Sequence, residues 1–167
     1  MKKTLGLVMA LVMILTAVSA FAAVPSKTTA DLVKVTTESK NVTVTATANE
    51  SAAVTALLEA LMENNAIPAD AKAVLPEGST FTKVEEVATL KIAGGTAEED
   101  LILNMEFPTN FAGKKVGVFL GLLGSDGITE WKFVEGTGKD DGSVDVVLSG
   151  ELQDWLNGRE FIALIAD

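Results

Sequence analysis

The side chains of this chain that could do chemistry are mostly carboxylates, because other reactive types are missing. The 167 residues include 23 acidic and 13 basic side chains, a formal net charge of −10, and no histidine, cysteine or tyrosine. Histidine is the usual general acid or base near neutral pH and the commonest metal ligand. Its absence excludes Ser-His-Asp and Cys-His catalysis, and ordinary zinc sites as well. We therefore predict a protein that is not an enzyme, with no catalytic residue, no cofactor and no metal.

The carboxylates themselves are poorly arranged for hydrolysis or for calcium. Acidic residues are neighbours at positions 85–86 and 98–100, whereas glycoside hydrolysis needs two carboxyl groups about 5–10 Å apart across a cleft. The loop that carries Asp140, Asp141 and Asp145 lacks the alternating acidic residues of an EF-hand. Turn formation explains this loop, and an irregular calcium site of low affinity is the alternative.

The first residues have the pattern of a secretory signal. Two lysines follow the first methionine, an uncharged apolar run extends from Leu5 to Val18, and Ala20-Phe21-Ala22 has the small-x-small form that signal peptidase accepts. The alternative to a cleavable signal is a retained membrane anchor, but the run is shorter than the roughly 20 apolar residues of a membrane-spanning helix. We predict a cleavable signal peptide over residues 1–22, export to the periplasm or the extracellular space, and no membrane insertion after cleavage.

A polar lead-in over residues 23–30, which we expect to be mobile, precedes one domain over residues 31–167. Its first part, 31–78, contains two segments rich in Val and Thr, 32–37 and 42–47, which predict a β-hairpin. The next segment, 51–65, has apolar residues at helical spacing, which predicts an amphipathic helix. These residues are Val54, Leu57, Leu58, Leu61 and Met62.

The second part, 79–167, is predicted to be a β module. Apolar residues recur with period two in successive segments, with an Asp126-Gly127 hairpin turn and a short helix near 150–157. These strand segments are 81–92, 101–107, 115–123, 128–134, 144–148 and 160–165. We predict a mainly β fold: an immunoglobulin-like, two-sheet antiparallel sandwich of about seven strands with the helix 51–65 as an accessory. A single curved sheet packed on that helix (α+β) is the alternative.

A possible contact surface follows from aromatic and glycine residues. Trp131 alternates with polar neighbours and is expected in the core, whereas Trp155 is the better candidate for contact with a partner. Gly117 and Gly121 flank Phe119 on one face of a strand, where glycine often marks close approach by another backbone or a ligand. Either the helix 51–65 covers this face, or a shallow groove lies beside Phe119.

Two stretches, 113–121 (GKKVGVFLG) and 126–131 (DGITEW), together with the later 141–144 (DGSV), resemble small secreted bacterial β-sandwich proteins of unknown function. The resemblance covers about residues 76–167. It implies an exported β module and transfers no catalytic residue.

These observations favour an exported, non-enzymatic binding or interaction module that engages an unknown protein or glycan at the cell envelope. The acidic composition disfavours nucleic acid as a partner. A structural envelope protein that self-associates through an edge strand near residues 42–47 is the second hypothesis. A carboxylate-dependent hydrolase is the third.

Overall fold

The computed structural model describes residues 26–27, 33–38, 41–48, 51–94 and 99–167. The predicted signal peptide, 1–22, lies outside the described residues. So does the predicted lead-in, 23–30, except for Ser26 and Lys27, which form the two-residue strand β1.

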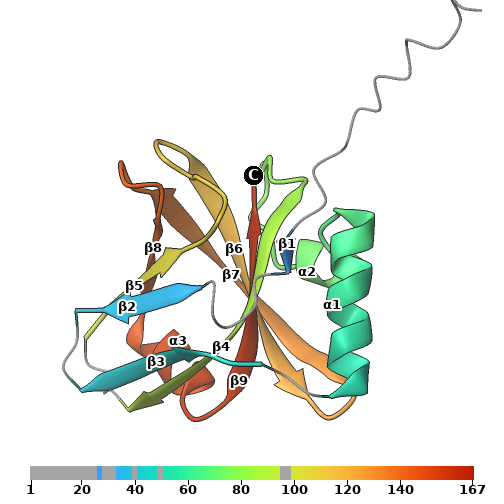
Figure 1. Cartoon of the computed structure of the whole chain (residues 1–167), viewed down its shortest axis with the longest axis horizontal. Coiled ribbons are helices and arrows are strands. Elements are labelled where there is room, and N and C mark those ends of the chain that lie inside the picture. Colours follow the sequence, from blue (N-terminus) through green and yellow to red (C-terminus); the bar gives the residue numbers. More distant parts are fainter. Residues whose placement is uncertain (1–25, 28–32, 39–40, 49–50, 95–98) are drawn as a thin grey trace, which may run out of the picture.

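The fold is mainly β, as the alternation predicts, with three helices (Figure 1). The strands are β1 (Ser26–Lys27), β2 (Lys34–Thr37), β3 (Val42–Ala46), β4 (Val84–Gly94), β5 (Leu101–Glu106), β6 (Lys115–Gly124), β7 (Gly127–Gly138), β8 (Val144–Leu148) and β9 (Glu160–Ala166). The helices are α1 (Ala52–Asn64), α2 (Ala69–Lys72) and α3 (Gly150–Leu156). The predicted helices at 51–65 and 150–157 and the hairpin at Asp126-Gly127 are confirmed.

All strands belong to one sheet, in the order β1-β4-β9-β6-β7-β8-β5-β2, with β3 paired to β4. The pairs are antiparallel except for β1, which runs parallel to β4. The sheet curves until it is nearly closed into a barrel. The two-sheet, immunoglobulin-like sandwich is therefore not confirmed, and the curved sheet packed on a helix is closer to the observed fold. Period two records which face of a strand is buried, and both architectures bury one face.

The predicted hairpin of segments 32–37 and 42–47 needs a correction. Both strands exist, but β2 pairs with β5 and β3 pairs with β4, and no ladder joins β2 to β3 among the described residues. Their edges flank the seam at which the sheet is almost closed. Period two could not reveal these partners, because it contains no information on which strand lies alongside.

Two apolar layers hold the fold together. Inside the curved sheet lie alternate side chains of its strands, including Val118, Leu120 and Phe161. Outside it, α1 and α2 pack on β4, β6, β7 and β9 through a second layer that contains Val54, Leu58 and Phe119. The strands β6 and β9 contribute to both layers, which is why their sequences are apolar on both faces.

No helix in the described part of the chain is long and apolar enough to cross a membrane.

Candidate functional site

The outer side of β2, β5 and β8 is not covered by α1 or α2, which pack on the opposite side of the molecule (Figure 1). We call the outward side chains of these three strands the open face. They are Lys34, Thr36, Ile102, Asn104, Glu106, Asp145 and Val147. Leu101, Leu103 and Met105 alternate with them and are buried inside the sheet.

Strand register arranges the open face in three rows. Lys34 is opposite Glu106, Thr36 is opposite Asn104, and Asn104 is in turn opposite Asp145. In the third row Ile102 is opposite Val147. These two side chains are 39% and 50% exposed, and they are the exposed large hydrophobic residues among those that the structure describes. The face therefore combines a charged row, a polar row and an apolar row.

Two shallow hollows adjoin the open face, and they share Asp141. The first, which we call the groove, has a volume of about 400 Å³ and is lined by Thr36, Thr37, Glu38, Ile102, Asn104, Lys139, Asp141 and Asp145. The second, which we call the end hollow, has a volume of about 370 Å³ and is lined by Glu106, Phe107, Pro108, Thr109, Asn110, Asp141, Gly142 and Ser143. Both have mixed linings in which polar residues predominate.

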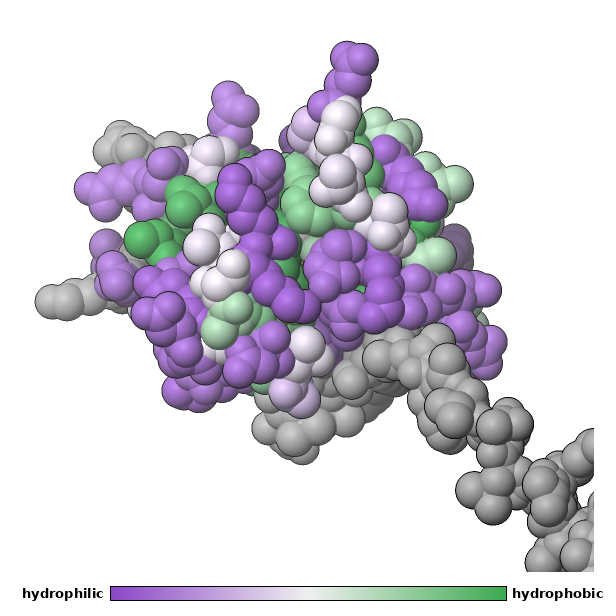
Figure 2. Space-filling view, turned by 90° about the horizontal axis from the view of Figure 1, so that it is seen from above, coloured by the Kyte–Doolittle hydropathy of each residue, from purple (hydrophilic) through white to green (hydrophobic). Residues whose placement is uncertain are grey.

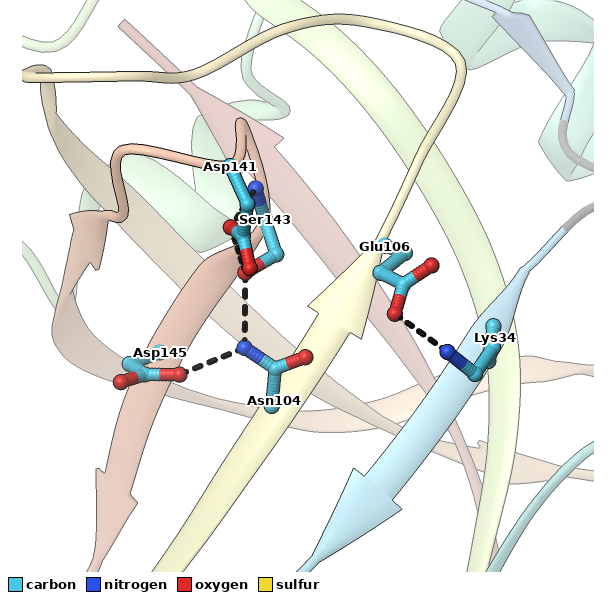
Figure 3. Close-up of polar contacts among 6 residues, drawn as sticks. All are labelled: Lys34, Asn104, Glu106, Asp141, Ser143 and Asp145. Carbon is cyan, nitrogen blue, oxygen red and sulfur yellow. Dashed lines mark hydrogen bonds and ion pairs between the residues drawn. The ribbon is translucent and has the colours of Figure 1, made fainter.

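A hydrogen-bond network fixes the polar row (Figure 3). The side-chain amide of Asn104 donates to Asp145 Oδ1 at 2.6 Å and to Ser143 Oγ at 2.8 Å. The Ser143 hydroxyl donates to Asp141 Oδ1 at 2.7 Å, and Lys139 Nζ lies 3.2 Å from Asp145 Oδ2. A carboxylate only accepts hydrogen bonds, so the amide nitrogen must face Asp145 and the amide oxygen must point away.

The charges of the face are partly paired. Lys34 Nζ lies 2.6 Å from Glu106 Oε1, and this hydrogen bond, followed by the charge of Glu106, raises the pKa of Lys34. The hydrogen bond from Lys139 to Asp145 likewise raises the pKa of Lys139. Hydrogen bonds from the Ser143 side chain and backbone lower the pKa of Asp141 below its ordinary value. All three groups are solvent-exposed, so these shifts describe ionisation rather than large stabilisation.

Two interlocked loops shape the end hollow. In the β7–β8 turn, the Asp141 carboxylate accepts a hydrogen bond from the Ser143 N–H, and Gly142 has a φ of +89°. The carbonyl oxygen of Gly142 accepts from the Phe111 N–H of the β5–β6 loop, at 3.1 Å. The region lies at the end of the sheet that is uppermost in Figure 1, and Figure 2, which shows the molecule from above, has mostly hydrophilic residues with smaller hydrophobic areas.

The residues predicted as a contact surface lie elsewhere. Phe119, Gly117 and Gly121 are buried on the outer side of β6, so no groove is open beside them. A Cβ at Gly117 would lie 2.9 Å from the Phe81 ring, and one at Gly121 would lie 2.8 Å from the Trp131 ring. These glycines accommodate aromatic rings beneath the helical layer. This arrangement corresponds to the first of the two alternatives, in which the helix 51–65 covers this face.

The two tryptophans differ in environment. Trp131 is 6% exposed, as its core prediction requires, and its indole N–H donates to Asp70 of α2 at 3.0 Å. Trp155 of α3 is half-buried against the inner layer. Its indole N–H donates to Glu130 at 3.1 Å, and Lys132 Nζ lies 5.1 Å from its ring centroid. Trp155 is thus partly accessible, but it lies apart from both hollows.

The acidic neighbours at 85–86 can be located, whereas position 98 of the group 98–100 lies outside the described residues. Glu86 is buried inside the sheet and bonds to Thr109, and Glu85 forms an ion pair with Lys83 at 2.5 Å. Asp141 and Asp145 use their oxygens in the network described above. Among the described residues, no group of three or more acidic side chains is placed to hold a metal ion.

Sequence reasoning missed Asn104 and Ser143. The alternation of segment 101–107 places Asn104 on the outward side, which is the only signal that the sequence offers. Its partner Asp145 is 41 residues away along the chain, so their meeting depends on the β5–β8 pairing.

No protein-family model, no curated protein and no solved structure matches the chain.

Proposed function

We propose that this protein is an exported, non-enzymatic binding module of the cell envelope or extracellular space, and that the open face is its binding surface. The observation that carries the proposal is the unequal covering of the sheet. Helices cover the outer side of β4, β6, β7 and β9. The strands β2, β5 and β8, with the adjoining β5–β6 and β7–β8 loops, instead present two hollows and the exposed pair Ile102 and Val147. Contiguous exposed apolar patches rimmed by polar residues mark interaction sites, and Ile102 and Val147 form a small patch of this kind.

The chemistry of the groove supports binding over hydrolysis. A carboxylate that acts as a general acid needs a raised pKa, so that it carries a proton near neutral pH. The pKa of Asp141 is instead lowered by Ser143, and both oxygens of Asp145 are engaged by Asn104 and Lys139. These side chains offer fixed hydrogen-bond acceptors to a partner.

A pair of blocking variants tests the proposal with ligands drawn from a screen. Thr36→Arg/Val147→Arg places two large side chains on the open face, and Ala56→Arg/Ala60→Arg places the same charges on the exposed side of α1. Peptide-display and glycan panels are screened against the wild type, and each ligand is then measured on both variants. A ligand that no longer binds the open-face variant but still binds the α1 variant supports the proposal. Ligands that bind both variants as well as the wild type contradict it.

Export has its own test. Expression of the full chain in a bacterial host, followed by mass spectrometry of the periplasmic and medium fractions, should give a mature protein that begins at Ala23. A full-length chain found only in the membrane fraction would overturn the signal-peptide prediction.

Self-association through an edge strand is a second candidate, favoured by one observation. The described residues of β3 form a ladder with β4 on one side only, and the other edge of β3 faces β2 across the seam without a ladder. Unpaired edge strands are templates for pairing with another chain. Sedimentation velocity at several concentrations would show a rising mass if this edge joins copies, and a constant monomer mass would end this candidate.

A further inference from the structure

We propose that the open face binds a basic polypeptide segment, with an arginine or lysine side chain seated in the groove. This inference rests on the proposed function and adds the chemical class of the partner. Three features of the face carry it: its hydrogen-bonding inventory, its charge and its apolar row.

The oxygen atoms that the Asn104 network and Glu106 leave without a hydrogen bond are acceptors. Both amide hydrogens of Asn104 are used within the protein, one on Asp145 and one on Ser143. Within the described part of the chain, no hydrogen bond reaches Asn104 Oδ1 or Glu106 Oε2. A partner that bonds to these oxygens must supply donors, and the side chains of arginine and lysine carry donors only.

The charge of the groove has the matching sign. Its lining includes three carboxylates, from Glu38, Asp141 and Asp145, against the single ammonium of Lys139, which lies 3.2 Å from Asp145. The whole chain is acidic as well, at −10, so a basic segment is attracted from a distance and an acidic one is repelled. The planar guanidinium of arginine also fits carboxylate oxygens in pairs.

The apolar row explains why the partner should be a polypeptide side chain with an aliphatic stem. Ile102 and Val147 lie directly beside the Asn104–Asp145 row, two residues away along each strand, which corresponds to roughly 7 Å. Arginine and lysine cover such surface with their methylene groups while their charged ends stay polar. No residue that lines the groove is aromatic, so the groove offers no ring on which a sugar could stack.

The test uses the mature protein and a synthetic octapeptide that alternates arginine and valine. Two further peptides replace each arginine by citrulline, which has the same shape without the charge, or by glutamate. Binding is measured by calorimetry at about 0.02 M and 0.3 M salt, between which exposed charges become strongly screened. Two variants of equal net charge are compared. The open-face variant, Asp141→Asn/Glu106→Gln, changes one carboxylate of the groove and one of the open face, and Glu59→Gln/Glu63→Gln changes two on the exposed side of α1.

We expect the arginine peptide to bind and to lose about tenfold or more of its affinity at the higher salt. The open-face variant should weaken binding at least about fivefold, whereas the α1 variant should change it less than twofold. Amide NMR shifts should map to residues 34–36, 102–106 and 141–147. Equal losses in both variants would overturn the inference, because the attraction would then be a property of net charge alone.

Failure of the inference can be separated from failure of the proposed function. If the citrulline peptide or a glycan binds the open face as well as the arginine peptide does, the face is a binding surface but its partner is not selected by charge. If no peptide binds, the inference that the partner is a basic segment is wrong. The proposed function is then tested by the Thr36→Arg/Val147→Arg variant, measured with the ligands from the screen.

Discussion

The carboxylate of Glu86, buried inside the curved sheet, accepts hydrogen bonds from both the backbone N–H and the hydroxyl of Thr109. Thr109 belongs to the β5–β6 loop and lines the end hollow. This contact connects the core of the fold to the candidate site, because the loop that shapes the hollow is held from inside the sheet.

Replacement of Thr109 by valine should therefore destabilise the protein and loosen this loop. The variant leaves the buried Glu86 side chain with one partner fewer, and removing a hydrogen-bond partner of a buried polar group costs about 1–3 kcal/mol. Chemical denaturation should show a loss of this size, and hydrogen exchange should be faster over residues 107–114. Thr109→Ser, which keeps the hydroxyl, should lose less.

Thr129→Val is the matched control, because among the described residues the Thr129 hydroxyl makes a single, long contact of 3.4 Å, to the carbonyl of Leu122. It should change the free energy of unfolding by less than about 0.5 kcal/mol. If Thr109→Val is as stable as this control, the contact with Glu86 does not hold the loop.

Gly138 provides a second prediction, because it lies where the β5–β6 loop crosses the end of β7. A Cβ there would lie 1.7 Å from the carbonyl oxygen of Phe111, a backbone atom that cannot rotate away. Gly138→Ala should cost about 3 kcal/mol or more, at the upper end for overpacking. Gly78→Ala, at a φ of +83° with open space around it, should cost only about 1–2 kcal/mol for backbone conformation. Similar melting temperatures for the two variants would refute the clash.

Much of the fold is predictable from the sequence, because the alternation of apolar and polar residues in a strand indicates which of its faces is buried. The alternation of 101–107 and of 144–148 places the same residues inside that the structure buries, and Asp126-Gly127 correctly joins two neighbouring strands. The alternation does not indicate which distant strand pairs with a given strand. Lys34 forms a hydrogen bond with Glu106, 72 residues away along the chain, and neither strand has a sequence feature that predicts this pairing.

The candidate site is harder to predict for a related reason. Phe119 and its flanking glycines stand out because they are unusual within a strand, and in the fold they are a packing device. Asn104 does not stand out, since one asparagine on a strand has no meaning without its partners. Its role arises from Ser143 and Asp145, which tertiary pairing brings to within 2.8 Å of its amide nitrogen.

The Asp141 carboxyl gives a prediction about pH. Its pKa is lowered in the fold by Ser143, so its contribution to stability is present above the unfolded value of about 3.9 and is lost as pH falls through the folded pKa. Carbon-detected NMR titration should find the pKa of Asp141 below about 3.9, the ordinary value for an aspartate. Ser143→Ala should raise it towards the ordinary value, and Ser125→Ala, in the distant β6–β7 turn, should leave it unchanged. If Ser143→Ala leaves the pKa of Asp141 unchanged, the hydrogen bonds from Ser143 do not lower this pKa, and the prediction is wrong.

The two tryptophans allow the covering of the sheet to be measured directly. Trp131 is buried beneath the helical layer, whereas Trp155 is half-buried against the inner layer. The fluorescence of the Trp155→Phe variant, which retains Trp131, should therefore resist quenching by iodide. The fluorescence of Trp131→Phe, which retains Trp155, should be quenched. Trp131→Ala should destabilise the protein by about 3–5 kcal/mol, the usual cost of removing a large aromatic residue from a core. Trp155→Ala should cost less, because water already reaches part of its ring. Strong quenching of Trp155→Phe, in which only Trp131 emits, would mean that α1 and α2 do not cover β7 in solution, and the contrast between covered and open faces would fail with it.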